Sequence, residues 1–309
     1  MKLAKILRTR SPLWIAALLK TLLKITVAVD EKIITTPSGD WFYREVHPPN
    51  PPTAPPVVFL HGLPSLGYSW SALLPDLASQ GVQGIAPDWL GFGRSHKPQK
   101  RDFAYTPDAF IEALQGFLDA MDLDRISLVV QGFLGSVGLQ YALRHRDRID
   151  RLAILNAPLS PEAKLPWKLK QMSFPLVGDM MTQDPLLIDR TLEAGSGFVI
   201  PDEDLDVYRR PWLKTSDSGR SLLYTLQNLQ LKTAMSEISQ GFQSWSQPTL
   251  VIWGMVDPWL APEPAQAFSQ QLENGDFVSL PEAAHYPQEH WSDDVGKRLI
   301  PFLRKASAT

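Results

Sequence analysis

Short apolar segments with strand character alternate with segments of helical periodicity along most of the chain, and no other feature limits its fold as strongly. The apolar segments VVFLHG (57–62), ISLVVQ (126–131) and TLVIWG (249–254) are each followed by a segment whose apolar residues recur at helical spacing. Strands that alternate with helices run parallel in one sheet, because each helix carries the chain back across a face of that sheet. The sequence therefore predicts an α/β fold with a mostly parallel sheet and helices on both faces.

The alternation is interrupted between residues 158 and 245, a region rich in prolines, methionines and aromatic residues. The chain has 309 residues, which is long enough for one large α/β core with a substantial insertion. We therefore predict a core formed by residues 30–157 and 246–309, with an inserted helical cap over residues 158–245.

Composition and charge exclude several classes of function. The chain contains no cysteine, which excludes disulfides, thiolate catalysis and cysteine-based metal sites, and its six histidines show no metal-binding spacing. The formal net charge is −3, so no overall basic character favours nucleic acid. We expect no metal, no other cofactor and no nucleic-acid partner.

The first 28 residues, MKLAKILRTRSPLWIAALLKTLLKITVA, are basic, amphipathic and free of acidic side chains. On a helical projection one broad face is apolar, while Lys20 and Lys24 lie together on the other side. We therefore predict that residues 1–29 form a helix in the membrane interface, which makes the protein peripheral on the cytoplasmic face. The two lysines argue against a membrane span and a cleaved signal peptide. A contact with its own core or with a partner is the alternative.

Several motifs follow the predicted strands, namely HGLPSLGYSW (61–70), PDWLGFGRSHKP (87–98), LVVQGFLGS (128–136), WGMVDPWLAP (253–262) and LPEAAHYPQEHW (280–291). With these motifs the chain resembles the α/β-hydrolase fold superfamily over essentially all of residues 31–305. The spellings HGLP and DPW resemble the haloalkane dehalogenase and epoxide hydrolase branch and its cyanobacterial and chloroplast relatives. For a cyanobacterial protein, the membrane would be the thylakoid or plasma membrane.

The resemblance implies a role for four residues. The superfamily places its nucleophile elbow, its acid and its histidine in that order along the chain, which implies that Asp257 and His285 are catalytic. It also implies an oxyanion hole formed by the backbone N–H groups of Leu63 and Phe133.

The apex of the elbow carries the nucleophile in this superfamily, and here it aligns with Gly132. Esterase relatives read LVGHSMGG and dehalogenase relatives VVHDWGG, and the strand ISLVVQ fixes the register. Ser136 is the alternative nucleophile, although LGSVG lacks the first glycine of GxSxG. Glycine suits a strained apex but supplies no hydroxyl or carboxylate, so no covalent intermediate is expected. Dehalogenation is not expected either, since Phe133 and Leu63 have no side-chain donor for a halide.

Two hypotheses for function remain, from different classes. In the first, the chain is a membrane-associated protein without the usual nucleophile that binds an apolar small molecule, a lipid or a membrane protein partner. In the second, it is an enzyme in which His285 and Asp257 supply a general base for water, a substrate proton or oxygen attack, as the resemblance to cofactor-free dioxygenases of this fold implies. Under both hypotheses we expect a ligand pocket lined by His61, Trp167 and Trp259.

Overall fold

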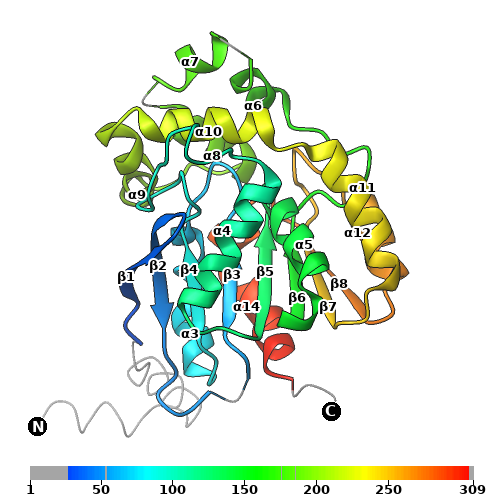
Figure 1. Ribbon diagram of the computed structural model, residues 1–309. Coiled ribbons are helices and arrows are strands. Elements are labelled where there is room, and N and C mark those ends of the chain that lie inside the picture. Colours follow the sequence, from blue (N-terminus) through cyan, green and yellow to red (C-terminus); the bar gives the residue numbers. More distant parts are fainter. Residues whose placement is uncertain (1–26, 53, 175, 185, 306–309) are drawn as a thin grey trace, which may run out of the picture.

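The computed structural model describes residues 27–52, 54–174, 176–184 and 186–305, and its strands form a single sheet (Figure 1). The strand order is β1-β2-β4-β3-β5-β6-β7-β8. β1 pairs antiparallel with β2 and β2 pairs antiparallel with β4, whereas the other neighbours pair in parallel. The predicted mostly parallel sheet is confirmed. Its strands are β1 (Asp30–Thr36), β2 (Gly39–Val46), β3 (Val57–Leu60), β4 (Gly84–Pro87), β5 (Ile126–Gln131), β6 (Ile149–Leu155), β7 (Thr249–Gly254) and β8 (Gly275–Leu280).

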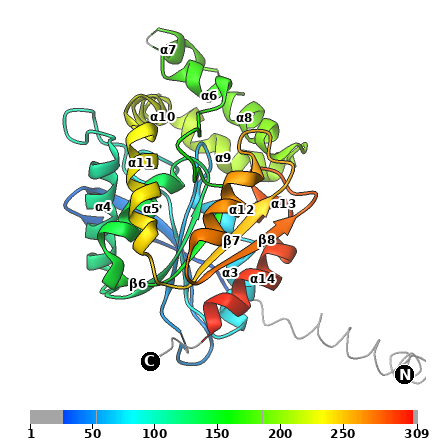
Figure 2. The same cartoon turned by 90° about the vertical axis from the view of Figure 1, so that its right-hand side faces the viewer.

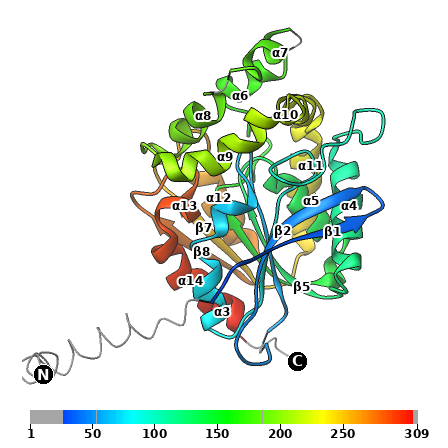
Figure 3. The same cartoon turned by 90° about the vertical axis from the view of Figure 1, so that its left-hand side faces the viewer.

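Helices cover both faces of the sheet, because successive side chains of a strand point to opposite faces. Val58 and Leu60 of β3 belong to a buried cluster shared with α4, α5 and α12, whereas Phe59 belongs to a second cluster shared with α3 and α14. Figures 2 and 3 show these two layers from either side. The helices are α3 (Leu74–Ser79), α4 (Pro107–Ala120), α5 (Gly135–Arg144), α12 (Pro262–Gln271) and α14 (Ser292–Arg304).

A cap of helices lies over the carboxyl ends of the parallel strands, inserted between β6 and β7 (Figure 1). The last helix of the insertion turns down beside α5, where Glu237 accepts hydrogen bonds from Arg144 Nε at 2.7 Å and Gln140 Nε2 at 2.6 Å. The predicted cap range therefore includes one helix that packs on the core. The inserted helices are α6 (Trp167–Met172), α7 (Val177–Met181), α8 (Leu187–Ser196), α9 (Asp202–Lys214), α10 (Asp217–Asn228) and α11 (Leu231–Gly241).

The starts of two helices in the core follow from local residues. α4 begins after Thr106, whose hydroxyl accepts a hydrogen bond from the N–H of Ala109 at 3.3 Å, as expected of a capping residue. α3 is a short helix, and a 3-10 turn (Gly67–Trp70) precedes it. Pro75 in the first turn of α3 has no N–H with which to continue a preceding helix.

The predicted amphipathic helix covers residues 1–29, and it stays a prediction for residues 1–26, which lie outside the described residues, whereas residues 27–29 are not helical. Where the structure is described, no helix is both long enough and apolar enough to cross a bilayer. The described chain starts at Val27, which packs with Val29 against the second buried cluster, the one shared with α3 and α14. This starting point lies at the end of the molecule away from the cap (Figure 1).

Candidate active site

Two loops that follow neighbouring strands bring an acid and a histidine into contact. His285 Nδ1, beyond β8, lies 2.8 Å from Oδ2 of Asp257, beyond β7, and both side chains are fully buried. Because a carboxylate only accepts hydrogen bonds, Nδ1 carries the proton and Nε2 keeps a lone pair. Nε2 is buried and has no hydrogen-bond partner among the described residues. An imidazole in this state can accept a proton from a ligand or from water.

Asp257 accepts hydrogen bonds on both carboxylate oxygens. Besides His285, Oδ2 accepts from Asn156 Nδ2 at 2.8 Å, and Oδ1 accepts from the N–H groups of Trp259 at 2.8 Å and Leu260 at 3.1 Å. A buried carboxylate is costly unless it is hydrogen-bonded, and these donors compensate its burial while fixing its orientation.

Sequence reasoning missed two residues that hold this arrangement. Asn156, just after β6, also exchanges hydrogen bonds with the backbone of Gly254, accepting from N–H at 2.8 Å and donating to the carbonyl at 3.2 Å. Gln131, the last residue of β5, donates to the His285 carbonyl at 2.7 Å and accepts from the Gly62 N–H at 3.1 Å. The signal in the sequence was an amide side chain at the carboxyl end of a predicted parallel strand, where ligand sites of such sheets lie.

The turn between β5 and α5 places Gly132 opposite the imidazole. Its φ is +65°, in the region that favours glycine. A Cβ at this position would lie 3.4 Å from His285 Nε2, 3.8 Å from the Leu63 nitrogen and 3.0 Å from the Gly62 Cα. A side chain at residue 132 would therefore start between the imidazole and the predicted oxyanion hole, the position that the elbow register predicts.

Ser136, the alternative nucleophile, lies in the first turn of α5. Its hydroxyl donates to the Phe133 carbonyl at 2.8 Å, a bond internal to the start of the helix. No hydrogen bond joins Ser136 to His285 among the described residues. The geometry therefore favours the Gly132 register over the Ser136 register.

The two predicted oxyanion-hole residues flank this turn. Leu63 and Phe133 are fully buried, and neither backbone N–H donates a hydrogen bond within the described part of the chain. The Leu63 carbonyl accepts from the Tyr286 hydroxyl at 2.9 Å, and the Leu63–Pro64 peptide bond is cis. The Phe133 ring stacks on the His285 ring, with centroids 5.6 Å apart. Their role in catalysis stays a prediction.

His61 holds two loops together instead of facing a ligand. Its Nδ1 lies 2.9 Å from the Gly62 carbonyl, and its Nε2 accepts from the Trp89 N–H at 3.1 Å, so both ring nitrogens have partners. Burial lowers the pKa of His61 to about 4, which keeps the ring neutral at pH 7. The prediction that His61 lines the ligand pocket is therefore not supported by its surroundings.

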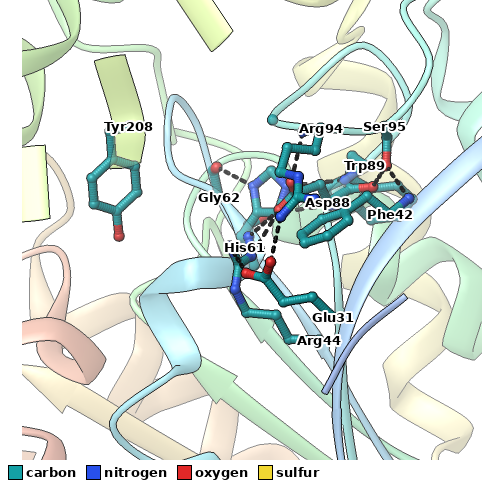
Figure 4. A network of polar contacts seen from close by, with 12 residues as sticks. Glu31, Phe42, Arg44, His61, Gly62, Asp88, Trp89, Arg94, Ser95 and Tyr208 are labelled. Atoms are coloured by element: carbon teal, nitrogen blue, oxygen red, sulfur yellow. Dashed lines mark hydrogen bonds and ion pairs between the residues drawn. The ribbon is translucent and has the colours of Figure 1, made fainter. Parts of the chain in front are cut away.

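Asp88, at the end of β4, organises the same loops (Figure 4). Its carboxylate accepts from the N–H groups of Gly67 at 2.8 Å and Arg94 at 2.9 Å, and lies 3.7 Å from Arg44 Nη1. Its carbonyl accepts from the Ser95 hydroxyl at 2.6 Å. The motifs of residues 61–70 and 87–98 are thus joined through one buried carboxylate, which fixes the loop that carries Leu63.

The two predicted pocket tryptophans lie in different surroundings. The Trp259 ring lies against the His285 ring, with centroids 4.6 Å apart, and also contacts Phe133. Trp167 is 61% exposed, and its ring contact is with Phe174 on the cap. The structure therefore brings Trp259 to the histidine and leaves Trp167 on the outer surface, because the six-residue helix α6 turns Leu169 and Met172 inward instead.

The cap closes over the dyad through α8. The His285 N–H donates to the Gly195 carbonyl at 3.0 Å. A Cβ on Gly195 would lie 2.5 Å from the Tyr286 ring and 2.7 Å from the Trp259 ring, so only glycine allows this approach. In this closed arrangement the whole His285 side chain, Nε2 included, is buried.

Two tyrosine–carboxylate hydrogen bonds join α9 of the cap to the loops of the site. The Tyr68 hydroxyl donates to Asp204 at 2.7 Å, and the Tyr208 hydroxyl donates to Glu289, four residues beyond His285. Burial raises the pKa of Glu289 to about 7, and the hydrogen bond from Tyr208 partly opposes this rise. The cap is therefore held to the core by a carboxyl group that titrates near neutral pH.

Within the described residues, no group of three or more His, Asp or Glu side chains is placed to hold a metal ion. The site itself combines a buried imidazole–carboxylate pair with two backbone N–H groups that make no hydrogen bond among the described residues.

Comparison with known proteins gives one consistent result. A family model described as the alpha/beta hydrolase fold matches residues 55–290. The chain is 27% identical to a haloalkane dehalogenase of Mesorhizobium japonicum over 269 residues, which cover 81% of this chain and 85% of the relative. It is also 27% identical to haloalkane dehalogenase 1 of Mycobacterium tuberculosis over 261 residues, which cover 80% and 83%.

Solved structures show the same fold. The haloalkane dehalogenase DbeA from Bradyrhizobium elkani superposes with a TM-score of 0.80 and 22% identity, covering 89% of this chain and 98% of that chain. The haloalkane dehalogenase DatA from Agrobacterium tumefaciens gives a TM-score of 0.77 and 21% identity, covering 89% and 96%. The resemblance expected from the motifs is confirmed at the level of the fold and of the haloalkane dehalogenase-like branch.

Proposed function

The chain belongs to the α/β hydrolase fold family, and from this membership we propose that it is an enzyme in which His285, oriented by Asp257, acts as a general base on a small or apolar substrate. One observation carries this proposal. The Nδ1 atom of His285 lies next to a carboxylate, whereas its buried Nε2 has no hydrogen-bond partner among the described residues. An unpaired buried polar atom costs about 1–3 kcal/mol, which a water or ligand in the site would offset.

In a hydrolytic reaction of this kind, Nε2 takes a proton from water as the water oxygen bonds to the electrophilic carbon of the substrate. Asp257 stabilises the imidazolium that forms. The N–H groups of Leu63 and Phe133 donate to the substrate oxygen on which negative charge develops. The imidazolium then gives its proton to the leaving group, so that His285 returns to its neutral form.

We also propose that no covalent bond to the protein forms at residue 132. Gly132 offers neither a hydroxyl nor a carboxylate to attack the substrate. Loss of a triad nucleophile costs on the order of 10⁶ in rate, about 8 kcal/mol, so turnover by water alone would be slow. The similar proteins are named haloalkane dehalogenases, but covalent displacement of a halide at residue 132 is not part of the proposal.

The test is turnover of a panel of ester, epoxide and haloalkane substrates by the wild type and three variants. We expect His285→Ala to abolish the slow hydrolysis and Ser136→Ala to leave it unchanged, since the Ser136 hydroxyl is bonded within its own helix. Gly132→Asp should increase turnover if only the nucleophile is missing. Equal rates for the wild type and His285→Ala would refute the general-base role.

A second candidate is a ligand-binding protein without turnover, which the complete burial of the dyad under the cap favours. Such a protein would hold an apolar small molecule, a lipid or a membrane protein partner, at a membrane surface bound through residues 1–28. Mass spectrometry of the purified full-length chain would test for bound lipid, and Lys20→Glu with Lys24→Glu should weaken membrane fractionation. Absence of any bound lipid, together with unchanged fractionation, would contradict this candidate.

A further inference from the structure

Exposed large apolar side chains are concentrated on the cap. Of the eleven that are exposed in the described part of the chain, nine lie between residues 158 and 245, whereas the core has only Ile33 and Val256. Six of the nine lie within twenty residues around α6 and α7, and this group is here named the cap tip. The cap tip consists of Trp167, Phe174, Leu176, Val177, Met180 and Leu186.

The cap tip is formed by the outer sides of α6 and α7 and by residues directly beside these helices and before α8, and the inner sides of both helices are packed. Leu169 and Met172 of α6 are buried, and a Cβ on Gly178 of α7 would lie 2.1 Å from the Met172 carbonyl and 2.5 Å from the Leu223 side chain. The helices therefore have a fixed orientation on α10. Leu176 and Met180 are 77% and 75% exposed as a consequence of this packing, not because the segment lacks contacts.

Basic side chains accompany the apolar face. Lys164, Lys168 and Lys170 are exposed, and none of them lies within salt-bridge distance of a carboxylate among the described residues. Of the carboxylates near the cap tip, Asp184 is paired with Arg190 at 2.9 Å, whereas Asp179 of α7 is exposed and leaves the lysines in the majority. Trp167 between these lysines has the amphipathic ring that favours the interface between headgroups and acyl chains.

The cap tip also has a position that a flat surface can reach. Figures 1, 2 and 3 show α6 and α7 as the part of the cap that projects furthest from the sheet. Val27, where the described chain begins, lies at the opposite end of the molecule (Figure 1). Any contact made by the cap tip is therefore spatially separate from the beginning of the described chain.

We propose that the cap tip docks on an anionic lipid bilayer, with its apolar side chains in the acyl boundary and the three lysines among the headgroups. Exposed apolar patches of this kind mark interaction sites, and free lysines beside them select an anionic lipid surface. Because the cap covers the dyad through α8, this docking would bring the closed side of the site to the membrane. The proposal goes beyond the catalytic role of His285 and does not depend on it.

The absence of cysteine allows a direct test on the full-length protein. Met180→Cys carries a single environment-sensitive fluorophore on the cap tip, and Asp124→Cys carries the same label at an exposed position in the loop before β5, at the end away from the cap. Both are mixed with phosphatidylcholine vesicles that contain or lack phosphatidylglycerol. We expect a blue-shifted, brighter emission for the residue 180 label with anionic vesicles only, and no change for the residue 124 label.

Two outcomes would overturn the proposal. If the protein pellets with anionic vesicles while the residue 180 label is unchanged, another segment binds the membrane, so the cap tip is excluded while membrane association stands. If the protein does not bind vesicles at all, both membrane proposals fail, whereas general-base catalysis by His285 is untouched.

Surface variants give a second measurement. Lys168→Glu with Lys170→Glu should reduce partitioning of the unlabelled protein to anionic vesicles by about tenfold or more, because each lysine near an anionic surface contributes to binding. The matched control is Val199→Ser with Leu213→Ser, two exposed apolar cap residues outside the tip, and it should partition as the wild type does. Equal loss in both pairs would exclude a specific role for the cap tip.

Discussion

The site has an acid–base side, formed by Asp257 and His285, and an elbow side, formed by the turn at Gly132. The two sides differ in how many contacts from the surrounding chain hold their side chains. On the acid–base side, Asp257 accepts four hydrogen bonds, and the backbone of His285 is held by Gln131 and Gly195. On the elbow side, Gly132 contributes only backbone, and a Cβ added there would lie closest to the Gly62 Cα and to His285 Nε2.

This difference shows that there is a physical reason for the acid–base pair to keep all its hydrogen bonds even without a nucleophile beside it. Once a carboxylate is buried, every missing donor destabilises the fold, so Asp257 must be satisfied whether or not it takes part in catalysis. The elbow carries no such requirement, since a glycine has no side-chain polar group to satisfy. Variants that separate activity from stability can therefore show which purpose the acid–base side serves.

The largest effect is expected from Asp257→Asn. An amide at this position can donate to Nδ1, which moves the imidazole proton to Nε2 and removes the base, so kcat/KM for any hydrolysed substrate should fall by about 10²–10⁴-fold, the contribution of a positioned general base. Steady-state kinetics would measure the loss. The control is Asp276→Asn, an exposed carboxylate of β8 that should change nothing. An unchanged rate in Asp257→Asn would mean that the acid–base side is only structural.

A smaller effect, on stability, is expected from Asn156→Ala. The variant leaves the Gly254 N–H unpaired and removes one donor from Asp257, and it places alanine at a φ of +40°, so the free energy of unfolding should fall by about 3 kcal/mol. Urea denaturation would measure it. Asn274→Ala is the control, because the Asn274 amide donates to the Ser246 carbonyl at 2.8 Å from an exposed position and its loss should cost under about 0.5 kcal/mol. Equal losses would show that burial of the dyad is not the costly feature.

The junction between the acid–base side and the cap should depend on pH. Burial raises the pKa of Glu289 to about 7 in the folded state, so the folded chain binds this proton more tightly than the unfolded chain does. Stability from this group is therefore fully present below about pH 4.5 and is lost as the pH rises towards 7. Between pH 5 and 8 the wild type should lose about 2 kcal/mol relative to Glu289→Gln. Urea denaturation of both proteins across this pH range would measure the difference. If the free energies of unfolding of the two proteins change with pH by the same amount, Glu289 makes no such contribution.

The sequence alone was sufficient for the framework of both sides of the site. Strand patterns predicted the sheet, and the resemblance to the α/β-hydrolase superfamily placed Asp257, His285 and Gly132 in one region at the carboxyl ends of its parallel strands. These features depend on residues that are adjacent along the chain, so a local pattern reveals them.

The supporting contacts could not be predicted in the same way. Asn156 reaches Asp257 across 101 positions of the chain and Gln131 reaches His285 across 154, and neither has a local signature that names its partner. Trp167 was expected in the pocket, but the inward turn of Leu169 and Met172 on a six-residue helix decides its exposure. Which face of a short helix packs inward is set by its neighbours in space and not by its own periodicity.

The smallest effect concerns the elbow side and is expected from the same substitution, glycine to alanine, at two positions, one in the elbow and one in a helix as its control. Gly132→Ala should lower the free energy of unfolding by about 1–2 kcal/mol, because the φ of +65° is unfavourable for alanine and the new Cβ would lie 3.0 Å from the Gly62 Cα. Gly116→Ala should raise it by up to about 1 kcal/mol, since this glycine lies inside α4 and a Cβ there meets nothing within 4 Å. Urea denaturation of both variants would test the contrast. If Gly132→Ala is as stable as the wild type, the elbow accepts a side chain freely, and the backbone gives no reason for glycine at the apex.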